Sequence, residues 1–451
     1  MNRKLRKIAT FVTMICLLVT LAACGGNKDA NGGNSQSGGS SESVGTPTAS
    51  GTPEPMKLKI VGNGSNFTTG WEAVMADAKT KGFEIELEKL PGGSQGDDIV
   101  KTRLATKELP DILLTYSGQA TIVGNGNPDE LYVDLTNQAW VKNLNLDTWG
   151  SSFAYQGKVV GAPFQGAQVM AVFYNKKVFE SMGLKPPTTY DEFLAACDVV
   201  AKAGKTPVFL PGKDPWTLQF PTLLSTAKKD STEITGKISQ NQMKFAEYED
   251  FKTGLNLLKE IVDKGYGSKD PFAHGYDDAV KALADGDAAM FMMGAWFMTD
   301  VVKKYPDKVN DIGAFAMPFP DGKTPTVAVA PSVALYVMKG SENQVAAEKF
   351  IEYFESIDTQ NIFFGAEGGI PEITGVSKLT LTPAELEAKE IVDAANGFVN
   401  FQGSVLKYPG GDFPSLSADI VGGKKTPEKV LEAMDKEFVK QAKSKNDPNF
   451  K

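Results

Sequence analysis

Histidine and arginine are both scarce in this chain of 451 residues. His274 is the only histidine, which excludes metal sites built from several histidines and any catalytic triad that does not use His274 itself. The arginines are Arg3, Arg6 and Arg103, and no cluster of basic residues follows the extreme N-terminus. Together with a formal charge of -8, this argues against an electrostatic surface for nucleic acid, and we expect no nucleic-acid partner.

Cysteine is also rare, with Cys16, Cys24 and Cys197. The first two lie in the N-terminal segment described next, so Cys197 has no partner for an intramolecular disulfide in the mature chain. It falls on the apolar side of a predicted helix, and we expect it to be buried rather than reactive. Stability must then come from core size. With 41% apolar residues and this length, the chain is expected to fold as two lobes.

An uncharged apolar run over residues 8–23 follows four basic residues. The run is shorter than the roughly 20 residues of a transmembrane helix and has the pattern of a secretory signal peptide. It ends in Leu21-Ala22-Ala23-Cys24, which resembles the bacterial lipobox, where the cysteine is acylated and becomes the new N-terminus. We expect residues 1–23 to be removed and Cys24 to anchor the protein to the outer face of the membrane, in a Gram-positive bacterium. An ordinary signal peptide with a chance cysteine is the alternative.

Residues 24–56 are rich in Gly, Ser, Asn, Thr and Pro and contain almost no large apolar residue. Such a segment cannot bury enough surface to fold, and we interpret it as a flexible tether after Cys24. Removal of residues 1–23 takes away four positive charges and no acids, so the count becomes 43 basic minus 55 acidic residues, or -12.

From residue 56 the pattern alternates between strand and helix. Strands are predicted at 58–61, 83–87 and 110–114, with a helix from about Trp71 and another before the third strand. This βαβαβ order predicts a doubly wound parallel sheet that binds ligands at the carboxyl ends of its strands. The loops 63–69 and 116–119 would lie there.

A second α/β block follows, with a strand at 169–174 and a helix that Thr189 and Glu192 open in capping-box spacing. The later expected elements are helices at about 243–264, 277–285 and 294–305, extended segments at 314–320 and 333–338, a helix after the capping-box pair Ser341 and Gln344, and a C-terminal helix that begins with Thr426 and Pro427.

Several motifs occur in an order that resembles one family. They lie at residues 109–114, 157–163, 173–176, 187–193, 286–290, 294–296 and 369–371. The set resembles the extracellular solute-binding proteins of bacterial ABC importers, in the carbohydrate-binding group, family 1, related to maltodextrin-binding protein. The resemblance spans nearly all of residues 57–440.

The resemblance implies a two-lobed α/β clamp, each lobe a doubly wound sheet flanked by helices, joined by hinge strands that cross between them. We expect lobe 1 at 57–165 plus 315–365 and lobe 2 at 166–314 plus 366–447. The implied function is capture of a carbohydrate, most simply an oligosaccharide, and its delivery to membrane permease subunits by a monomer without catalysis, cofactor or metal.

A sugar offers hydroxyl edges and apolar faces, so its site needs aromatic platforms and planar polar side chains. The resemblance places Trp296 in the cleft as a platform; a core tryptophan at a helix start is the alternative. It also places an acidic or amide group and an aromatic at Asp214 and Trp216, which could otherwise form a surface turn. Gln168 stands where maltodextrin binders carry a glutamate, and Gln165 is its near competitor.

Further candidates follow the strands of the first lobe or lie near the C-terminus. They are Asn63, Ser65, Asn66, Phe67, Tyr116, Ser117, Phe401, Gln402 and Phe413. Loop capping is the alternative for those of the first lobe. Asp111 is expected to hold backbone donors, and Gly368, Gly369 and Pro371 to shape a turn at the cleft rim.

Two other functions are consistent with parts of the sequence. A secreted glycoside-degrading enzyme could use paired carboxylates without histidine, but no pair is distinguished by spacing. The same clamp could instead bind a peptide, a polyamine, a metal complex or a phosphorylated polyol. A strongly anionic ligand would favour arginine in the cleft loops, where none occurs.

Overall fold

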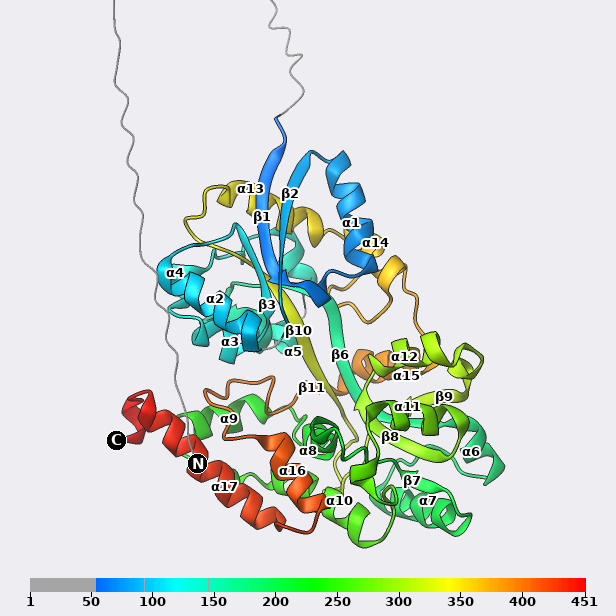
Figure 1. Ribbon diagram of the computed structural model, residues 1–451. Helices are drawn as coiled ribbons and strands as arrows, with labels where there is room; N and C mark the ends of the chain where they lie inside the picture. The colour runs from blue at the N-terminus through cyan, green and yellow to red at the C-terminus, as the bar shows by residue number, and fades with distance from the viewer. Residues whose placement is uncertain (1–53, 93, 145) are drawn as a thin grey trace, which may run out of the picture. The chain divides into compact units, whose positions relative to one another are not determined.

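The computed structural model describes residues 54–92, 94–144 and 146–451. Within these ranges most strands form one sheet of nine, in the order β2-β1-β3-β10-β6-β8-β7, with β11 beside β10 and β9 beside β6 (Figure 1). The strands are β1 Met56–Asn63, β2 Phe83–Leu90, β3 Ile112–Tyr116, β4 Ala154–Tyr155, β5 Lys158–Val159, β6 Ala162–Asn175, β7 Thr206–Val208, β8 Ala288–Gly294, β9 Ile312–Phe315, β10 Val327–Val337 and β11 Gly397–Val399.

Helices cover this sheet along its whole length. They are α1 Thr69–Thr80, α2 Ser94–Thr106, α3 Gln119–Gly124, α4 Pro128–Leu131, α5 Leu146–Phe153, α6 Lys176–Ser181, α7 Tyr190–Lys202, α8 Phe220–Ser225, α9 Ser231–Ser239, α10 Glu249–Asp263, α11 Tyr276–Asp285, α12 Phe297–Lys304, α13 Gln344–Phe354, α14 Ile357–Glu367, α15 Pro383–Ile391, α16 Phe413–Val421 and α17 Pro427–Ser444. No helix within the described ranges is long and apolar enough to cross a bilayer.

The first part of the chain forms the parallel βαβαβ unit that the sequence predicts. β1 pairs in parallel with both β2 and β3, and α1 buries Trp71, Val74 and Ala78 on one face. The buried indole of Trp71 packs against Phe164 and Phe350, with ring centroids 5.5 and 6.1 Å apart. Segments far apart in sequence therefore share one aromatic core.

Two long antiparallel strands, β6 and β10, connect the two halves of the sheet. The start of β6 pairs with the end of β10, which also pairs with β3, while the end of β6 pairs with β8 and β9. Figure 1 shows both strands running from the upper to the lower part of the described chain. This arrangement confirms the predicted two-lobed α/β fold with crossing strands, although the exact lobe boundaries stay a prediction.

The crossing strands are irregular where they change partners. The register of β10 against β6 shifts between Pro331 and Val333. Opposite this shift, Gln165 and Gly166 have φ values of 70° and 83°. A Cβ at position 166 would lie 2.6 Å from the carbonyl oxygen of Ile370, so the close approach of that segment requires glycine here.

The second half of the chain contains the parallel pair β7 and β8. Helix α7 opens with the predicted capping box, in which the backbone N–H of Glu192 donates to Thr189 and the Glu192 carboxylate accepts from the Thr189 N–H. Cys197 on this helix is a buried free thiol, as expected. Thr426 and Pro427 begin α17 as predicted.

Four predicted elements differ from the structure. Helix α12 begins at Phe297 instead of residue 294, because β8 occupies the chain up to Gly294. The predicted strand at 333–338 is the end of the longer β10. In the predicted segment 314–320, β9 ends at Phe315 and Met317 then forms an isolated bridge with Thr326. The capping box at Ser341 is wrong: α13 begins after Asn343, and the Gln344 side chain accepts from the Gly340 N–H. Short apolar runs do not distinguish strand from helix by periodicity, which explains the errors at 294–305, 314–320 and 333–338.

Candidate ligand-binding site

A cavity of about 490 Å³ lies beside the irregular part of β6. Gln165, Gln168 and Trp296, three of the predicted ligand-binding residues, line it together. Gly368 and Gly369 also line it, as expected for a rim. None of the described residues that line it is a lysine or arginine, and the carboxylates of Glu367 and Glu385 are the acidic groups among them. Such a surface suits a neutral polar ligand better than an anion.

Trp296 follows β8 after one residue and is half-buried. Its indole lies over Gly294, where an added Cβ would be 1.7 Å from the indole Cζ3. On another side, the indole packs against Phe220 of α8, with ring centroids 6.0 Å apart. Glycine at 294 thus makes room for the ring, which contributes to the wall of the cavity.

Trp216 belongs to the 3-10 helix η3, Pro215–Gln219, and is 37% exposed. Its ring lies 6.3 Å from that of Phe220 and 5.5 Å from that of Tyr276. Phe220 contacts both tryptophans but is itself 1% exposed, so the two rings share a buried neighbour, and Trp216 does not line the cavity at Trp296. Nothing in the sequence except its place four residues after Trp216 indicates this role of Phe220.

Asp214 lies two residues before Trp216, and one of its carboxylate oxygens stabilises the loop that carries both residues. Its Oδ2 accepts a hydrogen bond of 2.8 Å from the backbone N–H of Tyr276. The pKa of Tyr276 is raised, first by burial and then by a hydrogen bond from its hydroxyl to Asp300. The Tyr276 phenol is therefore a neutral donor at physiological pH, and its position beneath Trp216 is fixed.

The two glutamines of β6 differ in their surroundings. The Gln165 amide Nε2 donates to the backbone carbonyl of Asn66 at 2.9 Å, which ties the crossing strand to the loop after β1. Gln168 pairs through its backbone with Ala330, and its side chain makes no hydrogen bond within the described residues. Gln168 is the glutamine whose amide is available to a ligand.

Four predicted ligand-binding residues lie at the end of β1 and in the loop that follows it, and only some of them line a cavity. They are Asn63, Ser65, Asn66 and Phe67. Asn63 accepts from both the N–H and the hydroxyl of Ser65, which is the capping role considered as the alternative. Phe67 is 7% exposed and packs 5.3 Å from Trp71, in the core. Asn63, Asn66 and Tyr116 line a small cavity of about 20 Å³.

The last residue of β3 and the residue after it differ in exposure. Tyr116 is 52% exposed, and the Ser117 hydroxyl is buried without a hydrogen-bond partner among the described residues. A polar atom in this state gains from any donor or acceptor that a ligand brings.

His274, the single histidine, is half-buried, and its ring lies 5.7 Å from that of Phe209.

The C-terminal candidates divide in the same way. Phe401 and Phe413 are 1% and 2% exposed and pack together, and both also line a cavity of about 550 Å³. Gln402 is exposed and its Nε2 donates to Gln219 Oε1 at 2.9 Å, beside the same cavity, which these two residues also line. Gln219, which sequence reasoning missed, is three residues after Trp216 and contributes a planar amide to the wall of this cavity.

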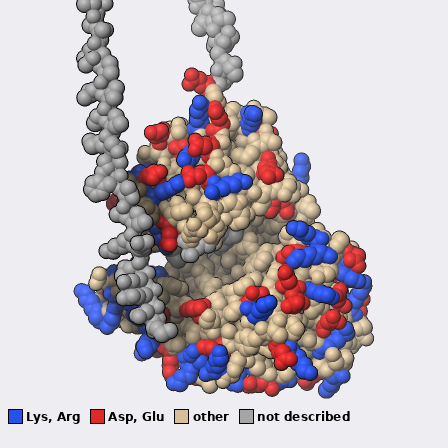
Figure 2. All heavy atoms as spheres, viewed as in Figure 1, with Lys and Arg blue, Asp and Glu red and all other residues tan. Residues whose placement is uncertain are grey.

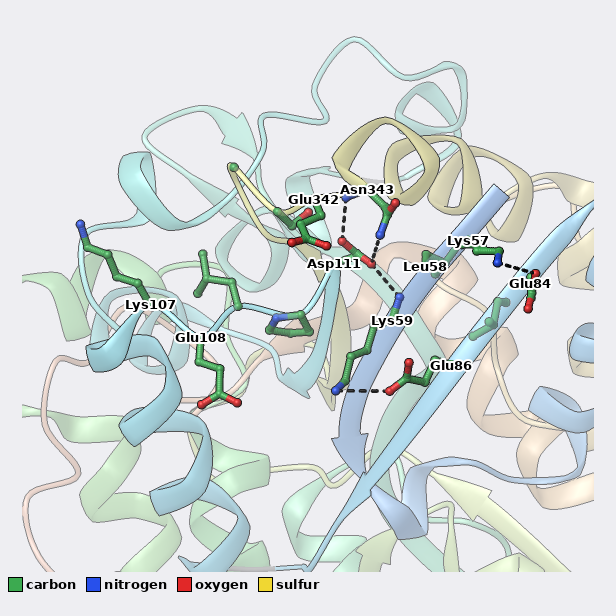
Figure 3. Close-up of a pocket in the computed structure, with 15 residues that line it drawn as sticks. Lys57, Leu58, Lys59, Glu84, Glu86, Lys107, Glu108, Asp111, Glu342 and Asn343 are labelled. Atoms are coloured by element: carbon green, nitrogen blue, oxygen red, sulfur yellow. Dashed lines mark hydrogen bonds and ion pairs between the residues drawn. The ribbon is translucent and has the colours of Figure 1, made fainter. Parts of the chain in front are cut away.

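A larger cavity, of about 820 Å³, lies at the opposite ends of β1, β2 and β3 (Figure 3). Its charged side chains are largely paired with one another, as in Lys59 with Glu86 at 3.4 Å. None of the predicted ligand residues lines it. Because α/β sheets bind ligands at the carboxyl ends of their strands, we place the candidate site at the cavity of about 490 Å³ that Trp296 lines. Among the described residues, no group of three potential metal ligands occurs.

Asp111 at this opposite end is structural, as predicted. It is 4% exposed, and its carboxylate accepts from the backbone N–H of Lys59 at 2.7 Å and of Asn343 at 3.0 Å. Figure 3 shows the carboxylate between the two segments.

Comparison with known proteins agrees with this geometry. Residues 64–361 match the family described as bacterial extracellular solute-binding protein. The chain belongs to this family. The members of the family in the comparison are binding proteins rather than enzymes, and proteins of this kind act outside the cytoplasm.

Two curated members illustrate the relationship. The multiple sugar-binding protein of Streptococcus mutans is 25% identical over 294 residues, which are 64% of this chain and 68% of that protein. The diacetylchitobiose binding protein DasA of Streptomyces coelicolor is 24% identical over 384 residues, 81% and 82% of the two chains.

Solved structures share the fold of this solute-binding protein. The apo-form of RafE from Streptococcus pneumoniae superposes with a TM-score of 0.72 at 20% identity and covers 89% of this chain and 100% of its own. RafE in complex with raffinose gives a TM-score of 0.67 at 21% identity, with 88% and 100% coverage.

Proposed function

We propose that this solute-binding protein captures an oligosaccharide between its two lobes and delivers it to the permease of an ABC importer. The observation that carries the proposal is the cavity that Gln168, Gln165 and Trp296 line together. Trp216 lies outside this cavity, is 37% exposed, and packs against the same Phe220 as Trp296 does. Aromatic faces and planar amides are what a sugar requires. The names of the multiple sugar-binding protein and of DasA support a carbohydrate ligand.

Closure of the lobes follows from the way they are joined. β6 and β10 cross between them, and Gln165 and Gly166 take left-handed backbone conformations at the crossing. A ligand that contacts both lobes favours the closed form, and a shift from about 1% to 99% closed needs about 5.5 kcal/mol of differential binding. Covering roughly 100 Å² of each aromatic face contributes about 2–3 kcal/mol of affinity. Since Trp216 and Trp296 both belong to lobe 2, the differential part comes from the contacts that the ligand adds with lobe 1 on closure.

The charge of the visible surface fits a neutral ligand. Figure 2 shows acidic and basic side chains interspersed over the face in view, whereas the hollow in its middle is mainly lined by uncharged residues. A polyol phosphate would gain less from such walls, and peptides, polyamines and phosphates serve as the comparison panel in the test.

The first test replaces each platform separately. We expect Trp216→Ala and Trp296→Ala to weaken oligosaccharide binding at least about tenfold, because each removes one stacking face. Trp216→Phe keeps a ring and should retain most of the affinity. Binding is measured by calorimetry after a screen of sugars, peptides, polyamines and phosphates for thermal stabilisation of the purified protein.

Wild-type affinity in both alanine variants would contradict the site. Val345→Ala, which changes a side chain that is 67% exposed on α13, serves as a matched surface control. If only a peptide or a phosphate stabilised the protein, its function as a solute-binding protein would stand and the proposed carbohydrate ligand would be refuted.

We further propose that Cys24 anchors the mature monomer to the outer face of the membrane of a Gram-positive bacterium. Cys24 and residues 1–23 lie outside the described residues, and the proposal rests on the lipobox-like sequence. Two acyl chains give stable membrane attachment where one does not. Cys24→Ser should move the protein from the membrane fraction to the medium, as cell fractionation with immunoblotting would measure. Continued membrane association of the variant would contradict the anchor.

A further inference from the structure

Helix α1 is capped at its N-terminus by a carboxylate 297 positions away in the sequence. The backbone N–H of Gly70, in the first turn of the helix, donates to Glu367 Oε2 at 2.9 Å. Thr68 occupies the N-cap position but makes no capping hydrogen bond, and its hydroxyl is buried without a partner among the described residues. Glu367 therefore supplies the cap that the local sequence does not. Its charge is also favourable at the positive end of the helix dipole.

Glycine at position 70 allows this contact. Gly70 is buried, and an added Cβ would lie 2.8 Å from the Cβ of Glu367 and 2.9 Å from the carbonyl oxygen of Phe363. Both neighbours belong to α14, so the two helices approach each other more closely here than a side chain would permit. Packing and a hydrogen bond together fix the position of Glu367 relative to α1.

Glu367 also belongs to the candidate ligand-binding site. It lines the cavity of about 490 Å³ together with Gln165, Gln168 and Trp296. As the last residue of α14, it directly precedes the two glycines of the cavity rim. One residue thus touches both the cavity and the first turn of α1.

The loop between β1 and α1, residues 64–68, is held beside the cavity at two points. At one point, Gln165 Nε2 donates to the carbonyl of Asn66 at 2.9 Å. At the other, Glu367 accepts from Gly70 just after the loop. Gln165 and Glu367 both line the cavity. Because the loop lies at the carboxyl end of β1, it is the part of lobe 1 that we expect to meet the ligand on closure.

We propose that Glu367 is a positioning residue for ligand binding, which holds the β1–α1 loop at its distance from the cavity by capping α1. This inference rests on the proposed carbohydrate function and extends it to a residue that no sequence motif singles out. Loss of the cap releases the loop while the predicted ligand-binding side chains all stay in the chain. Binding then weakens because the contacts with lobe 1 form less readily on closure.

The first test measures affinity by calorimetry in the purified full-length protein, with raffinose, stachyose and diacetylchitobiose as probes. For a probe that binds, Glu367→Ala should weaken affinity at least about fivefold. Glu367→Gln keeps an acceptor for the Gly70 N–H and should stay within about twofold of the wild type. Glu72→Ala, which removes an exposed carboxylate from the first turn of the same helix, is the matched control.

A substitution on the other side of the contact tests the same link. Gly70→Ala places a methyl group where Glu367 packs, so it should lower affinity as much as Glu367→Ala does. The double variant should lose no more than either single variant, because both remove one interaction. Additive losses would mean that Glu367 acts independently of α1.

Hydrogen exchange of the Gly70 amide, followed by NMR, separates positioning from a merely structural cap. A saturating probe sugar should slow this exchange at least about fivefold in the wild type, because closure secures the loop, and leave it unchanged in Glu367→Ala. A structural cap would give the same exchange with and without sugar.

Each result has a definite meaning. Wild-type affinity in Glu367→Ala overturns the positioning role, and so does exchange at Gly70 that does not respond to sugar. A loss in Glu367→Gln as large as in Glu367→Ala also overturns it, because the charge itself would then be the ligand contact. In these cases Trp296→Ala still loses affinity and the proposed function stands. If no sugar of the screen binds the wild type, the carbohydrate function is refuted and the positioning role with it.

Discussion

Gly294 is the residue on which the position of Trp296 depends. The indole occupies the space that a side chain at 294 would need, with Cζ3 1.7 Å from an ideal Cβ. We expect Gly294→Ala to displace the ring, lower sugar affinity to the level of Trp296→Ala, and cost about 1–3 kcal/mol of stability through overpacking. Calorimetric binding and urea unfolding measure the two effects.

The matched control is Gly124→Ala, since no heavy atom lies within 4 Å of a Cβ at that position and Gly124 is exposed. It should leave both quantities unchanged. A Gly294→Ala variant that binds like the wild type would mean that the indole can move without loss of the site.

Single residues show where sequence reasoning ends. Trp296 and Trp216 could be selected because ordered motifs resemble a family. The contact of both with Phe220, and the left-handed conformation of Gln165, depend on side chains and backbone from distant segments. The burial of Phe67 was missed for the same reason: its loop looks polar, but the ring packs against Trp71, whose indole shares a core with Phe164 and Phe350 from distant segments.

At the scale of elements, Asp111 connects three of them. Its carboxylate accepts from backbone donors of β1 and of the residue that precedes α13, while it stands itself at the start of β3. Asp111→Ala leaves these buried N–H groups without acceptors, and we expect a loss of about 2–4 kcal/mol in the free energy of unfolding. Urea denaturation measures it.

Asp98→Ala, at an exposed position of α2, is the control and should change stability by less than about 0.5 kcal/mol. Equal stability of the two variants would show that water replaces the Asp111 carboxylate at no cost.

Elements with regular alternation or distinct caps were predictable. β1, β2 and β3 alternate or are wholly apolar, and α7 and α17 carry their N-caps in the sequence. The lengths of β6 and β10 were not predictable. Each strand pairs with different partners along its length, and its end residues are extended because they pair with strands from distant parts of the chain. Ser341 has the residue type of a cap, but the local chain places Asn343 there.

At the scale of the whole molecule, two buried acids lie next to a segment that crosses between the lobes. Glu355 and Glu372 are 0% and 3% exposed, and both oxygens of Glu355 and Oε1 of Glu372 lack hydrogen-bond partners among the described residues. Glu372 follows Ile370, whose carbonyl accepts from the Ala167 N–H of β6 at 2.6 Å. Ionisation of this pair would therefore strain the region where the lobes are joined.

Burial raises the pKa of Glu372 from 4.5 to about 8, and burial followed by repulsion from Glu372 raises that of Glu355 well above its ordinary value. Between pH 4.5 and 8 the folded protein holds a proton on Glu372 that the unfolded chain has lost, so stability falls as pH rises, by up to about 1.4 kcal/mol per pH unit for this group.

We expect the melting temperature to fall from pH 5 to pH 8, and to fall less in Glu372→Gln, whose amide does not titrate. Glu342→Gln, at an exposed position, should follow the wild type. Parallel profiles for Glu372→Gln and the wild type would mean that water reaches the pair and keeps it ionised throughout.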